Sequence, residues 1–68
     1  MSIGERMLKF RAMRRITQKQ LSEMLGVPIY TVFSCENNKH KPTKANEIYL
    51  SSKLKELEES ENDNVQMQ

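Results

Sequence analysis

The side chains that could do chemistry in this 68-residue chain are charged and polar groups suited to binding rather than to catalysis. The chain has one cysteine, Cys35, and one histidine, His40, so it lacks both a nucleophile–base set and the paired Cys and His spacing of a zinc site. We therefore expect no enzymatic activity, no bound metal and no cofactor. A single cysteine also excludes a disulfide within the chain.

Charge is distributed unevenly along the chain, although the net charge is only +2. Residues 1–44 carry nine Lys and Arg against three Glu, a net charge of +6, whereas residues 45–68 carry a net charge of −4. A basic segment of this kind matches the electrostatic footprint of a protein that binds a polyanion. A solvated surface that happens to be basic fits the charge equally well.

Capping signals predict where the helices that carry these side chains begin. In a capping box, a Ser or Thr and a Glu or Gln three residues later satisfy free amides at a helix start. The chain has two such pairs, Ser2 with Glu5 and Thr17 with Gln20. They predict one helix over residues 3–14 and a shorter one over residues 18–25.

Gly26 and Pro28 mark the boundary between the second helix and a third. Gly commonly ends a helix by adopting a left-handed backbone conformation, and the fixed φ of Pro suits a first helical turn. We therefore expect the third helix to run from about Pro28 to Glu36. The apolar side chains expected in the core recur at helical spacing. They are Ile3, Met7, Phe10, Leu21, Leu25, Val27, Val32 and Cys35, and Met13 and Met24 are expected to fill gaps beside them.

A fourth helix is expected after Pro42-Thr43, from Lys44 to about Glu59, because this stretch contains neither Gly nor Pro. It is either one long helix or two helices with a bend at Ser51-Ser52. The remaining residues, 59–68, are polar and acidic, and this composition predicts a disordered tail.

Residues 3–42 resemble the Cro and lambda-repressor family of helix-turn-helix proteins. The run Thr17-Gln18-x-x-Leu21-Ser22-x-x-x-Gly26-Val27 is similar to the family's Thr-Gln-x-x-Leu-Ala-x-x-x-Gly-Val core. Further matches are Ile3-Gly4-Glu5-Arg6, Arg11, Val32, Glu36, Asn37 and Pro42, while Arg15 and Asn38 stand where the family usually has Gly. The resemblance implies an all-α fold, a lambda-repressor-like helix-turn-helix domain of four to five helices over residues 1–58.

The resemblance also implies that the start of the third helix meets base edges in the major groove of DNA. The outward residues there are Ile29, Tyr30, Thr31 and Ser34. They include no Arg for guanine and no Asn or Gln for adenine, so Ile29 would contact a thymine methyl group and the hydroxyls would bind bases or phosphates. Partial core packing is the alternative for Ile29 and Tyr30. Phe33 is left open: it is exposed, packs on the first helix or contacts a partner.

Contacts to DNA phosphates are expected at the start of the second helix and after the third. By resemblance, Gln18 binds a phosphate at the amino-terminal end of its helix, where anions are favoured. Asn37, Lys39 and Lys41 would lie along the phosphate backbone. The alternatives are a surface glutamine at a helix start and a solvated loop.

Two further sets of residues are expected to hold the structure together. Arg11 and Glu36 resemble an ion pair that the family buries between its first helix and the end of its third, although two unrelated surface charges would look the same. Leu50, Leu54 and Leu57 recur along the fourth helix and belong to the core, to a dimer interface, or to both. We assign them to a dimer interface, with some core packing.

The sequence thus predicts a sequence-specific DNA-binding transcriptional regulator, a phage or prophage Cro-type repressor that occupies its operator. Its partners would be double-stranded operator DNA and a second copy of the chain, in a bacterial cytoplasm. Antitoxins and restriction-modification controllers share this kind of domain, and an antirepressor or other protein-interaction module is the alternative function. No apolar run approaches the roughly 20 residues of a membrane span, and no small-molecule ligand is expected.

Overall fold

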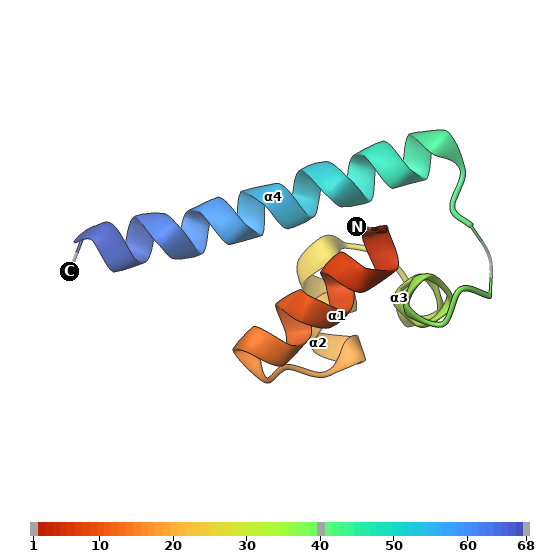
Figure 1. Ribbon diagram of the computed structural model, residues 1–68, viewed down its shortest axis with the longest axis horizontal. Coiled ribbons are helices and arrows are strands. Elements are labelled where there is room, and N and C mark those ends of the chain that lie inside the picture. The colour runs from red at the N-terminus through yellow and green to blue at the C-terminus, as the bar shows by residue number, and fades with distance from the viewer. Residues whose placement is uncertain (1, 40, 68) are drawn as a thin grey trace.

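The computed structural model describes residues 2–39 and 41–67, and residues 61–67 by their backbone alone. This described part contains four helices and no strand (Figure 1). The helices are α1 (Ile3–Arg14), α2 (Gln18–Leu25), α3 (Ile29–Glu36) and α4 (Lys44–Met67). The predicted all-α fold is therefore confirmed.

Both predicted capping boxes are present, which explains why α1 and α2 begin where they do. The Ser2 hydroxyl accepts a hydrogen bond from the Glu5 amide at 3.2 Å, and the Glu5 carboxylate accepts one from the Ser2 amide at 2.9 Å. Thr17 and Gln20 make the same reciprocal pair at 3.0 and 2.8 Å. Each box satisfies amides that have no partner within the helix.

Three residues with positive φ let the chain turn after α1, α2 and α3. Gly26 ends α2 with a φ of 74°, as predicted. Arg15 and Asn38, although neither is Gly, both have a φ of 56°. These turns therefore keep a left-handed geometry even though the residue that favours it is absent at two of them.

The start of α3 differs by one residue from the prediction. Pro28 has a ψ of 150°, so it is the cap that precedes the helix, and Ile29 is the first helical residue. The extended ψ of a cap residue is compatible with the φ of −63° that the proline ring imposes. No side chain caps this end of α3, because proline has no polar group to do so.

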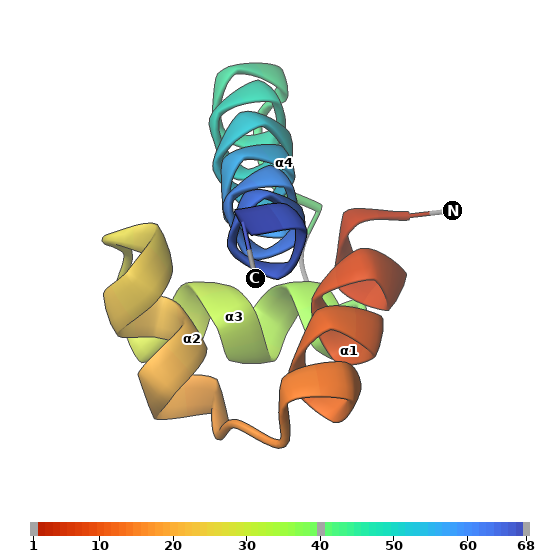
Figure 2. The same ribbon diagram turned by 90° about the vertical axis from the view of Figure 1, so that its left-hand side faces the viewer.

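The core lies between α4 and the layer formed by the other three helices. Figure 2 views α4 along its axis, with α2 and α1 on opposite sides below it and α3 crossing between and behind them. The packed pairs of helices agree with this view, since α3 contacts α1 and α2, and α4 contacts α1 and α2. The buried apolar residues are Ile3, Met7, Phe10, Leu21, Leu25, Val32, Cys35, Leu50 and Leu54, with Ile16, Val27 and Leu57 partly buried against them. Met13 and Met24 were expected in the core, but both are exposed.

Polar contacts attach α4 to this layer at both sides. Arg6 of α1 donates a hydrogen bond to the Ser51 hydroxyl at 2.6 Å and lies 3.8 Å from the Glu58 carboxylate. On the other side, the Tyr49 hydroxyl donates to the carbonyl oxygen of Leu25, at the end of α2, at 2.8 Å. These contacts set the position of α4 across α1 and α2.

The length of α4 differs from the prediction. The helix is continuous past Ser51-Ser52 and runs beyond Glu59 to Met67, so its backbone passes through most of the segment predicted to be a disordered tail. The absence of Gly and Pro over 44–67 lets the helix continue, whatever the polarity of its side chains. Figure 1 shows its last turns extending past the other helices. None of the described helices is apolar over a length that would cross a membrane.

Candidate functional site

A hydrogen-bond network centred on Glu36 joins three helices. Arg11 of α1 donates from Nε to Oε2 of Glu36 and from Nη2 to Oε1, both at 2.7 Å, and Gln18 of α2 donates from Nε2 to Oε1 at 3.0 Å. The Glu36 side chain is only 3% exposed. The predicted Arg11–Glu36 ion pair is therefore confirmed, as a bidentate pair that holds the end of α3 against α1 and α2.

Burial and charge act in opposite directions on the Glu36 carboxyl. Burial raises its pKa, but the hydrogen bonds from Arg11 and Gln18 and the charge of Arg11 outweigh burial and leave the pKa below its ordinary value. The hydrogen bond to Glu36 in turn raises the pKa of the Arg11 guanidinium, despite the opposing effect of its partial burial. The pair is consequently ionised at neutral pH.

Gln18 has an internal role that the sequence did not predict. Its side-chain amide donates to Glu36, so this group is held within the protein rather than directed freely toward solvent. Gln18 is also the first residue of α2, directly after the Thr17 cap. The network thereby fixes the amino-terminal end of α2 next to the end of α3.

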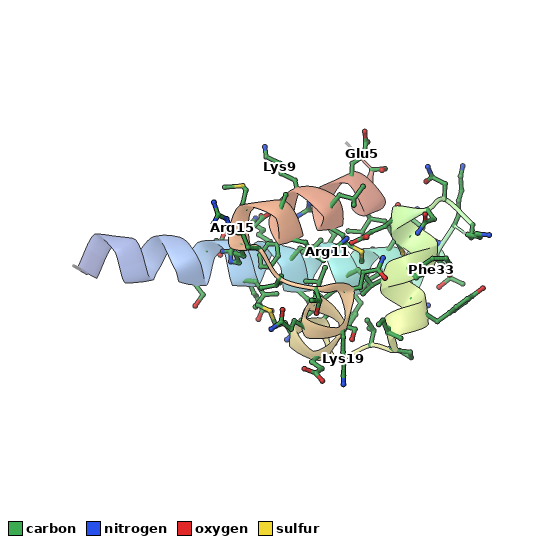
Figure 3. All side chains as sticks on the ribbon, turned by 90° about the horizontal axis from the view of Figure 1, so that it is seen from below. Glu5, Lys9, Arg11, Arg15, Lys19 and Phe33 are labelled. Atoms are coloured by element: carbon green, nitrogen blue, oxygen red, sulfur yellow. The ribbon has the colours of Figure 1, made fainter. Side chains whose placement is uncertain are left out.

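The outward side of α3 is apolar and exposed. Ile29 is 49% exposed, Tyr30 is 58% exposed and Phe33 is 38% exposed, and the rings of Tyr30 and Phe33 lie with their centroids 6.5 Å apart. Spacings of three and four residues put all three side chains on one side of the helix. We call Ile29, Tyr30 and Phe33 the apolar surface of α3. Figure 3 shows Phe33 at the outer edge of this helix.

Ser34 does not belong to this surface. It was predicted to contact bases, but it is 5% exposed and its hydroxyl has no hydrogen-bond partner among the described residues. At about 3.6 residues per turn, Ser34 lies closer to Tyr30 than to Val32 around α3, so its burial does not come from sharing the side of Val32 and Cys35. Thr31 is half-buried, which leaves it less accessible than Ile29 and Tyr30.

The residues after α3 remain accessible. Asn37 donates from Nδ2 to the carbonyl oxygen of Phe33 at 2.9 Å, and its exposed side chain caps the end of the helix. Lys39 and Lys41 are both exposed. Lys41 also lines a cleft of about 490 Å³ beside the start of α1, with Ser2, Gly4 and Lys44 among its neighbours. Of the residues predicted to contact phosphates, Asn37, Lys39 and Lys41 are thus exposed. The side-chain amide of Gln18 is hydrogen-bonded to Glu36 instead.

Leu50, Leu54 and Leu57 were assigned to a dimer interface and to the core. The core packing is confirmed, and the interface assignment of Leu50 and Leu54 is wrong. Both are buried inside the protein, where they pack with Leu21, Leu25 and Val32, and Leu57 is partly buried against the same cluster. The side of α4 that they occupy faces α1 and α2, so it is not available to a second chain. Different side chains of α4 point outward, among them Ile48, which is 59% exposed.

The other side chains that could do chemistry do not gather into a site within the described residues. Cys35 is buried in the core, and burial together with the negative charge of Glu36 raises the pKa of its thiol. Within the described residues, no three His, Cys, Asp or Glu side chains gather where they could hold a metal ion. His40 lies outside the described residues.

The position of Phe33 was left open by the sequence, and the structure shows it exposed. Its four-residue spacing from Ile29 puts the two side chains on one side of α3, but this spacing does not say which side of α3 meets the core. The bond from Tyr49 to the end of α2 joins residues 24 positions apart, and no local pattern predicts such a contact.

No relative of this chain was found among known proteins. No protein-family model matches the chain, and no curated protein and no solved structure matches it. What this chain does must therefore follow from its own residues and their arrangement.

Proposed function

We propose that this protein is a sequence-specific DNA-binding transcriptional regulator that acts by occupying an operator, as a phage Cro-type repressor does. In this proposal α2 and α3 form a helix-turn-helix, and α3 is the recognition helix that enters the major groove. The observation that carries the proposal is the placement of α3. Its one side, with Val32 and Cys35, is buried against α1 and α2, and its other side, with Ile29 and Tyr30, is exposed.

Positive charge beside α3 supports the same proposal. Lys19 is exposed in the first turn of α2, and Lys39 and Lys41 are exposed after α3. Figure 3 shows Lys19 on the edge of the molecule opposite to the one from which Glu5 and Lys9 project. Lysines at the start of α2 and after α3 would neutralise phosphates of the DNA strands that border the groove.

The network around Glu36 has a positioning role in this proposal. A helix-turn-helix binds a phosphate at the amino-terminal end of its first helix while its second helix reads bases, so the distance between the two must be fixed. Glu36 ties Gln18 of α2 to the end of α3. Gln18 would then help to orient α2, so that the backbone amides at its amino-terminal end face the phosphate.

The proposal includes a homodimer, because one recognition helix spans only a few base pairs and such proteins bind two half-sites related by two-fold symmetry. Ile48, exposed on the outward side of α4, lines a hollow of about 310 Å³ with Arg6 and Glu47. A two-fold contact there would bring together an apolar side chain and both signs of charge. We therefore place the interface on this side of α4.

The experiment is a measurement of DNA affinity across a range of salt concentrations. Sites selected from random duplex DNA would be bound by the wild-type protein and by a Lys39→Ala/Lys41→Ala variant. We expect the variant to bind all sequences more weakly and its log–log salt slope to be smaller by roughly 2, since each phosphate contact contributes about 0.9. The matched control is Lys9→Ala/Lys55→Ala, which removes the same charge from the outer side of α1 and from α4. It should leave the slope unchanged.

An antirepressor or other protein-interaction module is a second candidate, and the apolar surface of α3 is the observation that favours it. Exposed aromatic and aliphatic side chains that lie together are common at protein interfaces. The same selection distinguishes the two functions. A DNA reader enriches a common site from the random pool, and an interaction module enriches none.

A further inference from the structure

The side chains that α3 presents to solvent differ in chemistry from those that usually read DNA. Bases in the major groove are most often read by the paired donors of Arg or by the amides of Asn and Gln. The sequence of α3, IYTVFSCE, contains none of these, and its one charged residue, Glu36, is held by Arg11. Burial of Ser34 removes a hydroxyl that could have formed a hydrogen bond to a base.

What remains exposed is a nearly continuous apolar surface. Ile29 and Phe33 are one helical turn apart, and the Phe33 ring lies beside that of Tyr30. Ile29 offers a branched aliphatic end, and the two rings offer flat faces and edges. Such a surface gains free energy from contact with apolar atoms and little from base donors and acceptors.

The major groove offers one apolar group, the methyl carbon at C5 of a pyrimidine. Thymine carries it, and so does 5-methylcytosine, whereas unmodified cytosine does not. We propose that the apolar surface of α3 recognises pyrimidine C5-methyl groups, with Ile29, Tyr30 and Phe33 packed against methyl groups of neighbouring base pairs. This inference rests on the proposed DNA-binding function and names the chemistry that its recognition helix reads.

The charge around the surface favours DNA over a protein partner as its occupant. Lys19, Lys39 and Lys41 are exposed in the first turn of α2 and after α3, in a basic segment of net charge +6. Asn37 follows α3 and is exposed as well. An apolar strip with exposed lysines at the start of α2 and after α3 fits a groove whose floor carries methyl groups and whose rims carry phosphates.

The test first selects binding sites from random duplex DNA in two pools, one with ordinary cytosine and one with 5-methylcytosine. The selected site is then synthesised with uracil in place of each thymine, or with cytosine in place of each 5-methylcytosine. Both replacements remove only the C5-methyl group. We expect replacement at the recognised positions to weaken binding by at least about fivefold, within the usual effect of one mismatched base pair. Thymine is present in both pools, so a site that both pools yield identifies thymine as the source of the methyl group, and a site from the methylated pool alone identifies 5-methylcytosine.

Variants of the protein assign the effect to α3. Ile29→Ala and Phe33→Ala should bind the methylated and demethylated sites with nearly equal affinity. Leu8→Ala truncates an apolar side chain of similar exposure on α1, and it should keep the full discrimination. Circular dichroism would verify that each variant is folded, as expected for exposed positions.

The inference and the proposed function fail in different ways. If a selected site is bound equally well with and without its methyl groups, or if Ile29→Ala and Phe33→Ala keep the discrimination, the methyl recognition is wrong while DNA binding stands. If neither pool yields a site and binding shows no salt dependence, the DNA-binding function itself is wrong.

Discussion

Glu36 ends α3 and accepts hydrogen bonds from two other helices, through Arg11 of α1 and Gln18 of α2. A carboxylate that is 3% exposed carries a large desolvation cost, and here it is offset by a bidentate guanidinium and an amide. Removal of one partner leaves the other charge buried and unpaired. The consequences of such a change are therefore larger than those of losing a surface ion pair.

Arg11→Met should lower the free energy of unfolding by about 3–5 kcal/mol, because Glu36 would remain buried without its cation. Replacement of both partners, Arg11→Met with Glu36→Leu, should recover much of this loss. Urea denaturation followed by circular dichroism measures both effects. An unchanged midpoint in the single variant would show that the pair contributes nothing to stability.

The lowered pKa of Glu36 also predicts how stability depends on pH. A carboxyl whose pKa is lower in the folded state contributes stability that is present above its ordinary pKa, near 4.5, and is lost as the pH falls through the lowered value. Between about pH 7 and about pH 3, the wild-type protein should lose more free energy of unfolding than Glu36→Gln. Glu5, whose pKa is lowered by hydrogen bonds with Ser2, titrates in both proteins and supplies the shared background. Parallel pH profiles would contradict the assignment.

The backbone of α1 passes very close to the backbone of α3 at Gly4. A Cβ atom built on Gly4 would lie 2.9 Å from the carbonyl carbon of Cys35 and would clash with the carbonyl oxygen. Both obstacles are backbone atoms, so no side-chain rotation relieves them. Gly4 is required for close approach, since its own backbone is ordinary helix.

Gly4→Ala should therefore destabilise the protein by about 1–3 kcal/mol, as overpacking usually does, even though Ala favours a helix by about 1 kcal/mol over Gly. The midpoint of thermal unfolding shows whether the substitution stabilises or destabilises the protein. The reverse change at an exposed position of the same helix, Ala12→Gly, should also destabilise, by about 1 kcal/mol, because only helix propensity acts there. A Gly4→Ala protein that melts at a higher temperature would mean that α1 and α3 are farther apart.

At the scale of the whole molecule, α4 has two sides with different roles. Its inner side contributes Leu50 and Leu54 to the core, and its outer side carries Ile48. Truncation of Leu54 to Ala should cost about 2–5 kcal/mol in any oligomeric state, as for other buried leucines. The association of two chains should depend on the outer side instead.

Ile48→Asp should convert the proposed homodimer into a folded monomer, because it places a charge at the centre of the contact. Sedimentation velocity gives the molecular mass, and circular dichroism should show unchanged helix content. Lys9→Asp, at an exposed position of α1, changes more charge and serves as the control for a general electrostatic effect. A dimer that persists in Ile48→Asp would exclude this side of α4 as the interface.

The sequence alone determined where α1 and α2 begin and where α2 ends. Capping boxes and a glycine at a helix end act over three or four residues, so the pattern and the structure it produces lie within the same short segment. The end of α4 was less predictable, because acidic, polar residues without Gly or Pro are compatible with both helix and disorder. The Arg11–Glu36 pair, 25 residues apart, came from the family resemblance, since no local pattern links them.

Only the tertiary structure decided which side of each helix is buried. Periodicity predicted that Leu50, Leu54 and Leu57 share a side of their helix, but it could not say whether that side meets this chain or a second one. In α3 the same uncertainty concerned Ser34 and Phe33, and in the folded protein the serine is buried and the phenylalanine is exposed. The physical reason is that burial depends on how distant segments pack, and local hydrophobic spacing specifies only the angle between side chains on one helix.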